Sequence, residues 1–346
     1  MSLGRVILEG MMNPLQKLLT RACLRARDNA TVDRLVSTLF QWWYDLPVNP
    51  FDLSPRHDIG EIFRRCYAMP FPPTHYYSPL PHLPDVKKNF ARWYKESTSP
   101  GIDWNLPEQI DLAESISGYA HELVSLPTFA QVTQEGYGLG YGEVEGNVLY
   151  MMMRHLKPSS VVEVGSGVST FYTLSALRTN RERDGVEARM TCIEPYPSDK
   201  LRTLVSQGDV HLRALEVQDV DFGVFEQLSA NDVLFIDSSH VSKIDSDVNF
   251  LYLEVLPRLR RGVGVHIHDM PFPMPALPRD HPLFDNFLFW NEAALVKAFL
   301  LFNTDFKITM CQSYLHYTRP EVLKKLVPAY DPRRLFPASL WLQKVR

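Results

Sequence analysis

Short apolar runs alternate with amphipathic segments along most of the chain beyond residue 160. Runs of this kind, bounded by glycine, aspartate or proline, are typical of strands buried inside a sheet. They predict strands at residues 161–165, 190–194, 211–217, 233–237, 262–269, 306–312 and 339–345. Apolar residues at helical spacing predict helices at residues 169–177, 199–206, 245–260 and 290–302. This alternation indicates an α/β fold with a mostly parallel sheet and right-handed crossovers.

The two ends of the pattern differ from its middle. Between the last two expected strands no helix of matching length is visible, and we therefore expect an antiparallel hairpin at the C-terminal edge of the sheet. Ahead of the first strand, helical spacing occurs at residues 13–44, 85–96, 107–125 and 144–155. The expected architecture is a sheet of seven strands preceded by a mainly helical N-terminal extension.

Prolines divide the chain. Most of the 26 prolines fall within three segments, at residues 47–84, 271–282 and 320–337. Because proline lacks a backbone N–H and restricts the residue before it, the first of these segments cannot form regular helix. We expect a proline-rich extension at residues 1–130 and a sheet domain at residues 131–346, with a lid at 270–290 and an insertion at 315–337. The extension is expected to cover the substrate or to join copies of the chain in a homo-oligomer.

Composition narrows the class of protein. A content of 45% hydrophobic and 12% aromatic residues excludes a disordered chain. The formal net charge of −4 argues against a nucleic-acid partner, and no apolar run approaches the roughly 20 residues that span a membrane. The N-terminus lacks the pattern of a secretion signal. The four cysteines form no CxxC pair, so reduced thiols in a cytoplasmic protein are expected at Cys23, Cys66, Cys192 and Cys311.

A glycine-containing turn follows the first expected strand, in the segment Glu163–Gly167 just before a helix. Glycines let the backbone turn sharply and approach a ligand, and the helix N-terminus offers unpaired N–H groups. A dinucleotide fingerprint would place a third glycine at position 170, where this chain has Thr170. Glu163 also suits a cationic end of a ligand better than a pyrophosphate.

Two further acids follow the next strands. Glu194 ends the second strand, where a carboxylate is placed to accept both hydroxyls of a ribose. Asp219 follows the third strand and is placed to meet the amino group of an adenine. Open α/β sheets bind ligands at this edge. The alternative, a tight strand–helix turn flanked by surface acids, stays open at this point.

These residues and the order of strands and helices resemble the class I S-adenosylmethionine-dependent methyltransferases, over roughly residues 130–346. The resemblance implies a Rossmann-like, seven-stranded sheet and S-adenosylmethionine as cofactor. It implies that Gly165, Ser166 and Gly167 contact the methionine part, that Glu194 binds the ribose and that Asp219 binds the adenine. Tyr141, in a loop before the first strand, is a candidate for covering the amino-acid end of the cofactor.

A second group of polar residues ends the fourth and fifth expected strands. Asp237 and His240 follow one strand, and His268 and Asp269 follow the other. Neighbouring parallel strands would bring all four to one edge of the sheet. Two carboxylates and an imidazole there are suited to holding a divalent cation, Mg²⁺ or Mn²⁺, on Asp237, His268 and Asp269. His240 is the expected general base, since its ordinary pKa lies near neutrality.

The segment around these residues resembles bacterial small-molecule methyltransferases, including metal-dependent sugar O-methyltransferases. In those enzymes an Asp-x-x-His segment supplies a ligand and the base, and an acidic pair completes the metal site. This chain has His268 in place of the first acid of that pair. His268 is thus open to three interpretations, as a ligand, as a second base or as a substrate contact, while Asp237 has an alternative role as a helix cap.

The expected reaction is methyl transfer from S-adenosylmethionine to a hydroxyl of a small molecule, such as a sugar or a secondary metabolite. Aromatic residues in the lid are candidates for a substrate pocket or for ordinary packing: Phe272, Phe284, Phe287, Phe289 and Trp290. The main alternative is a nicotinamide-dependent oxidoreductase, against which Thr170 and the lack of a Tyr-x-x-x-Lys pair both count. The other alternative is a non-catalytic binding protein that retains the cofactor fold.

Overall fold

The computed structural model describes residues 34, 38, 74, 76–97, 99–138, 140–279, 281, 284 and 288–346. Apart from residues 34 and 38, the helix expected at residues 13–44 lies outside these described residues, as do the cysteines at positions 23 and 66. The chain divides into two compact units, Met1–Phe90 and Ala91–Arg346. Residues 91–130, which we expected to belong to the N-terminal extension, fall in the unit that contains the sheet.

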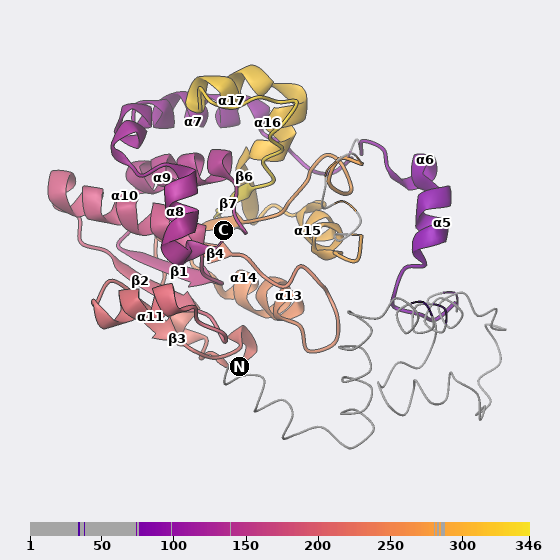
Figure 1. Cartoon of the computed structure of the whole chain (residues 1–346), viewed down its shortest axis with the longest axis horizontal. Coiled ribbons are helices and arrows are strands. Elements are labelled where there is room, and N and C mark those ends of the chain that lie inside the picture. Colours follow the sequence, from indigo (N-terminus) through magenta and orange to yellow (C-terminus); the bar gives the residue numbers. More distant parts are fainter. Residues whose placement is uncertain are drawn as a thin grey trace. The chain divides into compact units, whose positions relative to one another are not determined.

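The second unit is built on a seven-stranded sheet with the strand order β3-β2-β1-β4-β5-β7-β6 (Figure 1). Strands β1 to β5 pair in parallel, and β7 is antiparallel to both β5 and β6. This is the expected mostly parallel sheet with an antiparallel C-terminal edge. The strands are β1 (Ser160–Val164), β2 (Arg189–Ile193), β3 (His211–Arg213), β4 (Val233–Ile236), β5 (Gly264–Ile267), β6 (Phe306–Cys311) and β7 (Leu340–Lys344).

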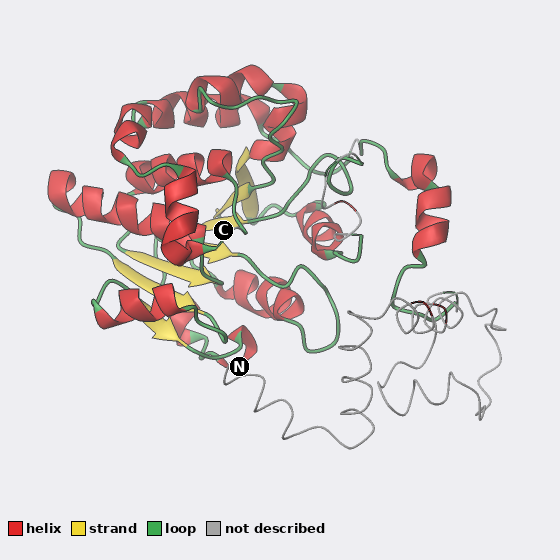
Figure 2. Cartoon of the chain, in the orientation of Figure 1, coloured by secondary structure: helices red, strands yellow, loops and turns green. Residues whose placement is uncertain are grey.

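Helices cover both faces of the sheet (Figure 2). Successive side chains of a strand point to opposite faces, so a continuous apolar run supplies two cores at once. In β4, Phe235 joins the core beneath α9 (Glu143–Leu156) and α10 (Val168–Asp184). Ile236 joins the opposite core, beneath α13 (Asp247–Phe250) and α15 (Glu292–Leu300). This double burial is why β4 and β5 contain hardly any polar residue before their C-terminal ends.

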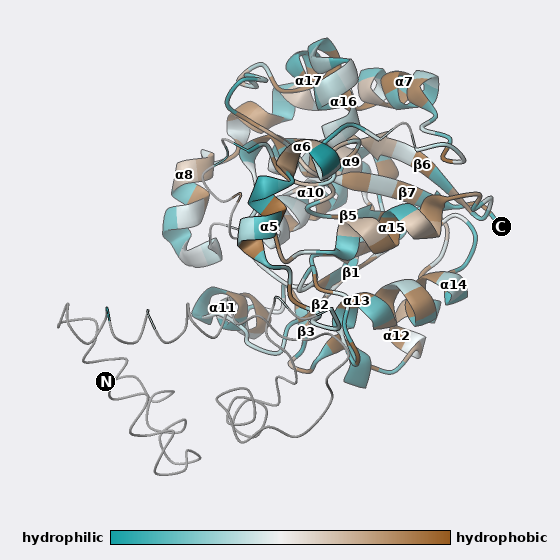
Figure 3. Cartoon of the chain, turned by 90° about the vertical axis from the view of Figure 1, so that its right-hand side faces the viewer, coloured by the Kyte–Doolittle hydropathy of each residue, from teal (hydrophilic) through white to brown (hydrophobic). Residues whose placement is uncertain are grey.

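The remaining helical segments complete the two layers and the first unit. They are α5 (Leu83–Lys88), α6 (Phe90–Trp93), α7 (Leu106–Ser117), η1 (Ala120–Ser125), α8 (Phe129–Val132), η2 (Thr133–Tyr137), α11 (Asp199–Ser206), η3 (Val217–Asp219), α12 (Gly223–Glu226), η4 (Leu251–Val255), α14 (Leu256–Arg258), α16 (Gln312–Thr318) and α17 (Pro320–Leu326). Helices such as α11 and α13 carry both hydrophilic and hydrophobic residues, as expected for helices with one solvent face (Figure 3).

The structure corrects three expected elements. The third strand ends at Arg213 instead of residue 217, because β3 pairs with β2 alone and the chain then turns into η3. Two helices, α16 and α17, lie between the last two strands, where no helix of matching length was expected. The helix expected at 245–260 runs as α13, the π-helical turn η4 and α14, and it ends close after Pro257, which has no N–H to donate.

Part of the lid is fixed by aromatic contacts. Phe272 packs edge-on against Trp104, and Trp104 also stacks on Tyr314 with ring centroids 4.4 Å apart. Phe284 stacks on Trp93 with centroids 6.3 Å apart. These residues therefore pack against the segment at 93–104, and the contacts favour the packing interpretation for Phe272 and Phe284.

Two further expectations concern cysteines and membranes. Cys192 and Cys311 are buried free thiols, as expected. Among the described residues, no helix is at once long enough and apolar enough to cross a bilayer.

Candidate active site

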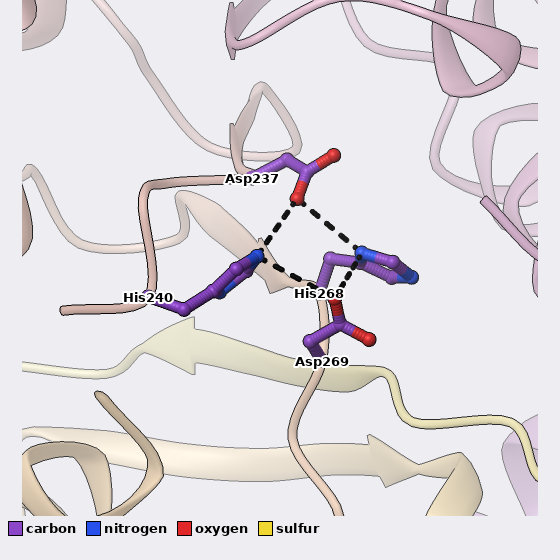
Figure 4. A group of neighbouring side chains, drawn as sticks. All are labelled: Asp237, His240, His268 and Asp269. Carbon is purple, nitrogen blue, oxygen red and sulfur yellow. Dashed lines mark hydrogen bonds and ion pairs between the residues drawn. The ribbon is translucent and has the colours of Figure 1, made fainter. Parts of the chain in front are cut away.

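Four polar side chains meet at the C-terminal edge of β4 and β5: Asp237, His240, His268 and Asp269, here called the tetrad (Figure 4). Nε2 of His240 lies 3.4 Å from Oδ1 of Asp237 and 3.4 Å from Oδ2 of Asp269. Nδ1 of His268 lies 3.3 Å from each of the same two oxygens. Nitrogen and oxygen atoms thus alternate around one common point, and all four lie within 4.8 Å of one another.

The register of the sheet explains this meeting. Ile236 of β4 pairs with Ile267 of β5, so Asp237 and His268 are the next residues of two neighbouring parallel strands. The structure therefore brings together the four residues that the sequence placed at this edge. Their chemical roles stay predictions.

The backbone of the tetrad is strained at two positions. His240 has φ of 61° and Asp269 has φ of 57°, both in the left-handed region. This region costs an ordinary residue roughly 1–2 kcal/mol relative to the right-handed one, although histidine and aspartate occur there more often than most. Left-handed residues of this kind concentrate at functional sites, where the surrounding structure holds them in place.

Buried glutamates contact the far side of both histidine rings. Nδ1 of His240 lies 2.6 Å from Oε2 of Glu292, the first residue of α15. Nε2 of His268 lies 3.3 Å from Oε1 of Glu145, in the first turn of α9. Sequence reasoning found neither glutamate. Each comes from an element remote from the strand ends, and the available signal, an acid in a first helical turn, is explained equally well by the helix dipole.

Burial and the dense charge of the site shift its pKa values in opposite directions. Burial by itself lowers the pKa of His240, but hydrogen bonds to Asp237 and Glu292 outweigh it and raise the value to about 10. Burial also lowers the pKa of His268, which the carboxylates of Asp269 and Asp237 nevertheless raise well above its ordinary range. Burial raises the pKa of Asp269 to about 6, against the opposing effect of the histidines.

The negative charge of the carboxylates at this site requires a compensating positive charge. Four carboxylates, from Asp237, Asp269, Glu145 and Glu292, surround two imidazole rings with little exposed surface. Carboxylates buried without compensation are costly, so the site must hold protons on its histidines or a cation between its ligands.

The donor atoms of the tetrad fit a divalent cation. Its four nitrogen and oxygen atoms all lie within 4.8 Å of one another, which is about twice an ordinary metal–ligand distance. Imidazole nitrogen is a ligand that transition ions prefer, and carboxylate oxygen suits both these and harder ions. Of the two ions expected from the sequence, Mn²⁺ therefore fits this donor set better than Mg²⁺.

The glycine turn adjoins the tetrad. Gly165 has φ of +94°, and a Cβ atom placed on it would lie 2.9 Å from the carbonyl oxygen of Asp237. At Gly167 the backbone N–H donates to Oγ1 of Thr170, in the first turn of α10. Thr170, which replaces the third glycine of a dinucleotide fingerprint, thus caps the helix.

The other predicted cofactor contacts are differently placed. Both oxygens of Glu163 are buried and accept hydrogen bonds from Ser169, Thr170 and Cys192, while burial raises its pKa to about 7. These hydrogen bonds direct the carboxylate of Glu163 toward Ser169, Thr170 and Cys192. A direct contact of Glu163 with the cofactor stays a prediction. Glu194 accepts from Ser166 at 3.3 Å and from the N–H of Tyr196 at 2.9 Å.

Asp219 and Tyr141 occupy opposite environments. Asp219 is exposed, at the end of η3 and not at the end of a strand. Tyr141 is buried; its hydroxyl bonds Nε2 of His266 at 2.9 Å, and its ring lies 4.6 Å from that of His268. Tyr141 therefore packs directly behind the tetrad, against the fully buried His266.

A cavity of about 540 Å³ opens beside the tetrad. Its lining includes His268, Asp269, Trp290, Leu277 and Phe336. Trp290 also packs on the ring of His240, with centroids 4.1 Å apart. The lid and the segment before β7 therefore contribute apolar walls to a cavity whose polar end is the tetrad.

Comparisons with known proteins match the sheet domain. A family model described as a methyltransferase domain matches residues 162–270. An uncharacterized protein of Archaeoglobus fulgidus is 30% identical over 181 residues, which cover 50% of this chain and 80% of that protein.

Similar solved structures share little sequence with this chain. The O-methyltransferase TomG from Streptomyces achromogenes, in complex with SAM, is 15% identical with a TM-score of 0.38, and the match covers 76% of this chain and 96% of that one. A methyltransferase from Geobacter sulfurreducens is 17% identical with a TM-score of 0.37, covering 67% and 96%.

Proposed function

The chain belongs to the class I S-adenosylmethionine-dependent methyltransferases, and from this premise we propose that it methylates a hydroxyl group of a small molecule with His240 as general base. The observation that carries this proposal is the tetrad at the ends of β4 and β5, in contact with the glycine turn through Asp237.

The cofactor is proposed to lie over the glycine turn. Gly165, Ser166 and Gly167 would contact its methionine part, Glu194 its ribose and Asp219 its adenine. Ser166 and Glu194 already share a hydrogen bond, which supports a common binding surface for these two residues. The contact between Gly165 and Asp237 would place the sulfonium methyl close to the tetrad.

Proton transfer is assigned to His240. As the acceptor oxygen forms its bond to the methyl carbon, the carbon–sulfur bond breaks and its electron pair stays on sulfur. The hydroxyl proton passes to Nε2 of His240. The products are the methyl ether and S-adenosylhomocysteine. The short contact between Nδ1 of His240 and Glu292 supports this assignment, because it stabilises the imidazolium that forms.

Asp237, His268 and Asp269 are proposed to hold a divalent cation. When bound, such an ion lowers the pKa of the acceptor hydroxyl and compensates the carboxylates. The acceptor itself is proposed to occupy the cavity lined by Trp290, Leu277 and Phe336. Apolar walls with one polar end suit a sugar or a secondary metabolite that presents a hydroxyl.

Binding and transfer together test the proposed function. Titration calorimetry should give heat with S-adenosylmethionine and none with NAD. A panel of hydroxylated sugars and phenolic metabolites, matched with their amino analogues, should then be incubated with methyl-labelled cofactor. Label should appear in hydroxylated compounds alone. Binding of NAD without S-adenosylmethionine, or label confined to amines, would contradict the proposal.

Replacing Gly165 with alanine is expected to weaken the binding of S-adenosylmethionine at least about tenfold and to destabilise the fold by more than about 1 kcal/mol. The new Cβ is strained at φ of +94° and meets the carbonyl of Asp237 at 2.9 Å. Gly185→Ala is the matched control, since φ is +70° and nothing lies within 4 Å of its Cβ. Calorimetry and thermal unfolding should show a stability loss in both variants and an affinity loss only at position 165.

A further inference from the structure

We propose that Glu145 and Glu292 act as a pair of positioning residues, which keep an N–H of each tetrad histidine on its outer nitrogen, so that the inner nitrogen is the one available to take a proton or to bind a cation. The inference rests on the proposed function and extends it to two residues outside the tetrad. Bare inner nitrogens at both rings are what that function needs, because one must accept a proton and the other must bind a cation.

Glu292 is fixed as an acceptor toward His240. Its Oε1 accepts hydrogen bonds from Tyr252 at 2.8 Å and from Ser238 at 2.9 Å. Its Oε2 is thereby directed at Nδ1 of His240, 2.6 Å away, in a position where both side chains are almost fully buried. An ionised carboxylate only accepts hydrogen bonds, so Nδ1 carries a hydrogen. Nε2, which lies 3.4 Å from both aspartates, is then the nitrogen available to take a proton.

Glu145 has the same arrangement toward His268, with the ring reversed. Its Oε1 accepts from the backbone N–H of Ala338 at 2.9 Å and from the hydroxyl of Ser339 at 3.0 Å. A backbone N–H only donates, so this oxygen is an acceptor, and Nε2 of His268, 3.3 Å away, is the donor. Nδ1, which lies 3.3 Å from each of the two aspartates, is then the nitrogen available to bind a cation.

The backbone makes room for Glu145. A side chain on Gly142, the residue before α9, would collide with the carboxylate of Glu145. Ala338 and Ser339 lie just before β7, so Glu145 also joins the start of α9 to the strand beside β5. Glu145 and Glu292 thus reach the tetrad from two different helices, α9 and α15, and contact different histidines.

The test is the tautomer of each ring in the full chain. Protein labelled with ¹⁵N at histidine should be examined by long-range ¹H–¹⁵N correlation, with and without saturating Zn²⁺, and His240→Asn and His268→Asn should be used to assign the signals. With Zn²⁺, we expect hydrogen on Nδ1 of His240 and on Nε2 of His268. A hydrogen on the inner nitrogen of either ring in the Zn²⁺ sample would overturn the inference, whatever the variants do.

Two variants then separate the roles. Glu292→Gln should change the ring signals of His240 and leave those of His268 unchanged. Glu145→Gln should change the ring signals of His268 and leave those of His240 unchanged. Glu145→Gln should also weaken the affinity for Co²⁺ about 10- to 100-fold. Glu122→Gln, a buried glutamate paired with Arg154 away from the site, controls for lost stability and should change neither ring. Unchanged ring signals in both site variants would refute the inference. Because these readouts need no turnover, an inactive protein with the expected tautomers would contradict the proposed function alone.

Discussion

Replacing His240 with asparagine is expected to slow methyl transfer by a factor of about 10² to 10⁴, the usual contribution of a general base. The side chain of His240 is 8% exposed and its Nε2 lies between the two aspartate oxygens of the tetrad, where an acceptor hydroxyl would meet it. Asparagine retains polarity and tolerates the left-handed backbone at this position, so the loss should be chemical and not structural. Single-turnover rates with S-adenosylmethionine measure it directly.

Two controls accompany the rate of His240→Asn: its affinity for S-adenosylmethionine and the rate of a variant at a histidine outside the tetrad. Calorimetry should show unchanged binding of S-adenosylmethionine to His240→Asn, since the glycine turn is untouched. His121→Asn, on the exposed face of η1, should keep the full rate. A rate for His240→Asn within threefold of the native rate would assign proton removal to another group.

Exhaustive removal of divalent ions is expected to lower the rate about a hundredfold or more, because a bound cation contributes several kcal/mol to such a reaction. Mn²⁺ should restore the rate more fully than Mg²⁺, since the proposed ligands include the imidazole nitrogen of His268. The measurement is methyl transfer after dialysis against a chelator, followed by titration with each ion.

The two ions distinguish between sets of ligands. Equal recovery with Mg²⁺ and Mn²⁺ would point to oxygen ligands alone and remove His268 from the metal site. Full activity after chelation would remove the cation from the mechanism and leave the protonated histidines to balance the carboxylates. Asp237→Asn, which removes one ligand charge, should lower the affinity for Mn²⁺ in the same titration.

The sheet and the tetrad followed from the sequence because both depend on short-range patterns. Strand β4 is apolar on both faces, so its end is visible as the first polar residue, Asp237, while β5 has the single buried His266 before it ends at His268-Asp269. Parallel pairing of neighbouring strands then brings these ends together without further information.

The glutamates behind the histidines were not predictable in this way. Glu145 and Glu292 lie 123 and 52 residues from the rings that they contact, on helices whose packing is set by the tertiary fold. For Glu163, the position before the glycine turn predicted a ligand contact, and this pattern could not show that its carboxylate also accepts hydrogen bonds from Ser169 and Thr170. Patterns locate a strand end, but the direction of a side chain there depends on its neighbours.

The left-handed backbone at His240 and Asp269 bears on attempts to make this protein more robust. A survey of strained positions would choose these two for replacement by glycine, which relieves the conformational cost. Any gain in thermal stability from these two replacements would lower the activity, because the side chains of His240 and Asp269 form part of the tetrad. Asn231 is also left-handed, and it is exposed in the turn before β4. Replacing Asn231 with glycine would relieve backbone strain without removing a side chain of the tetrad. Thermostabilisation should therefore begin on the turn before the strand and leave the residues after it unchanged.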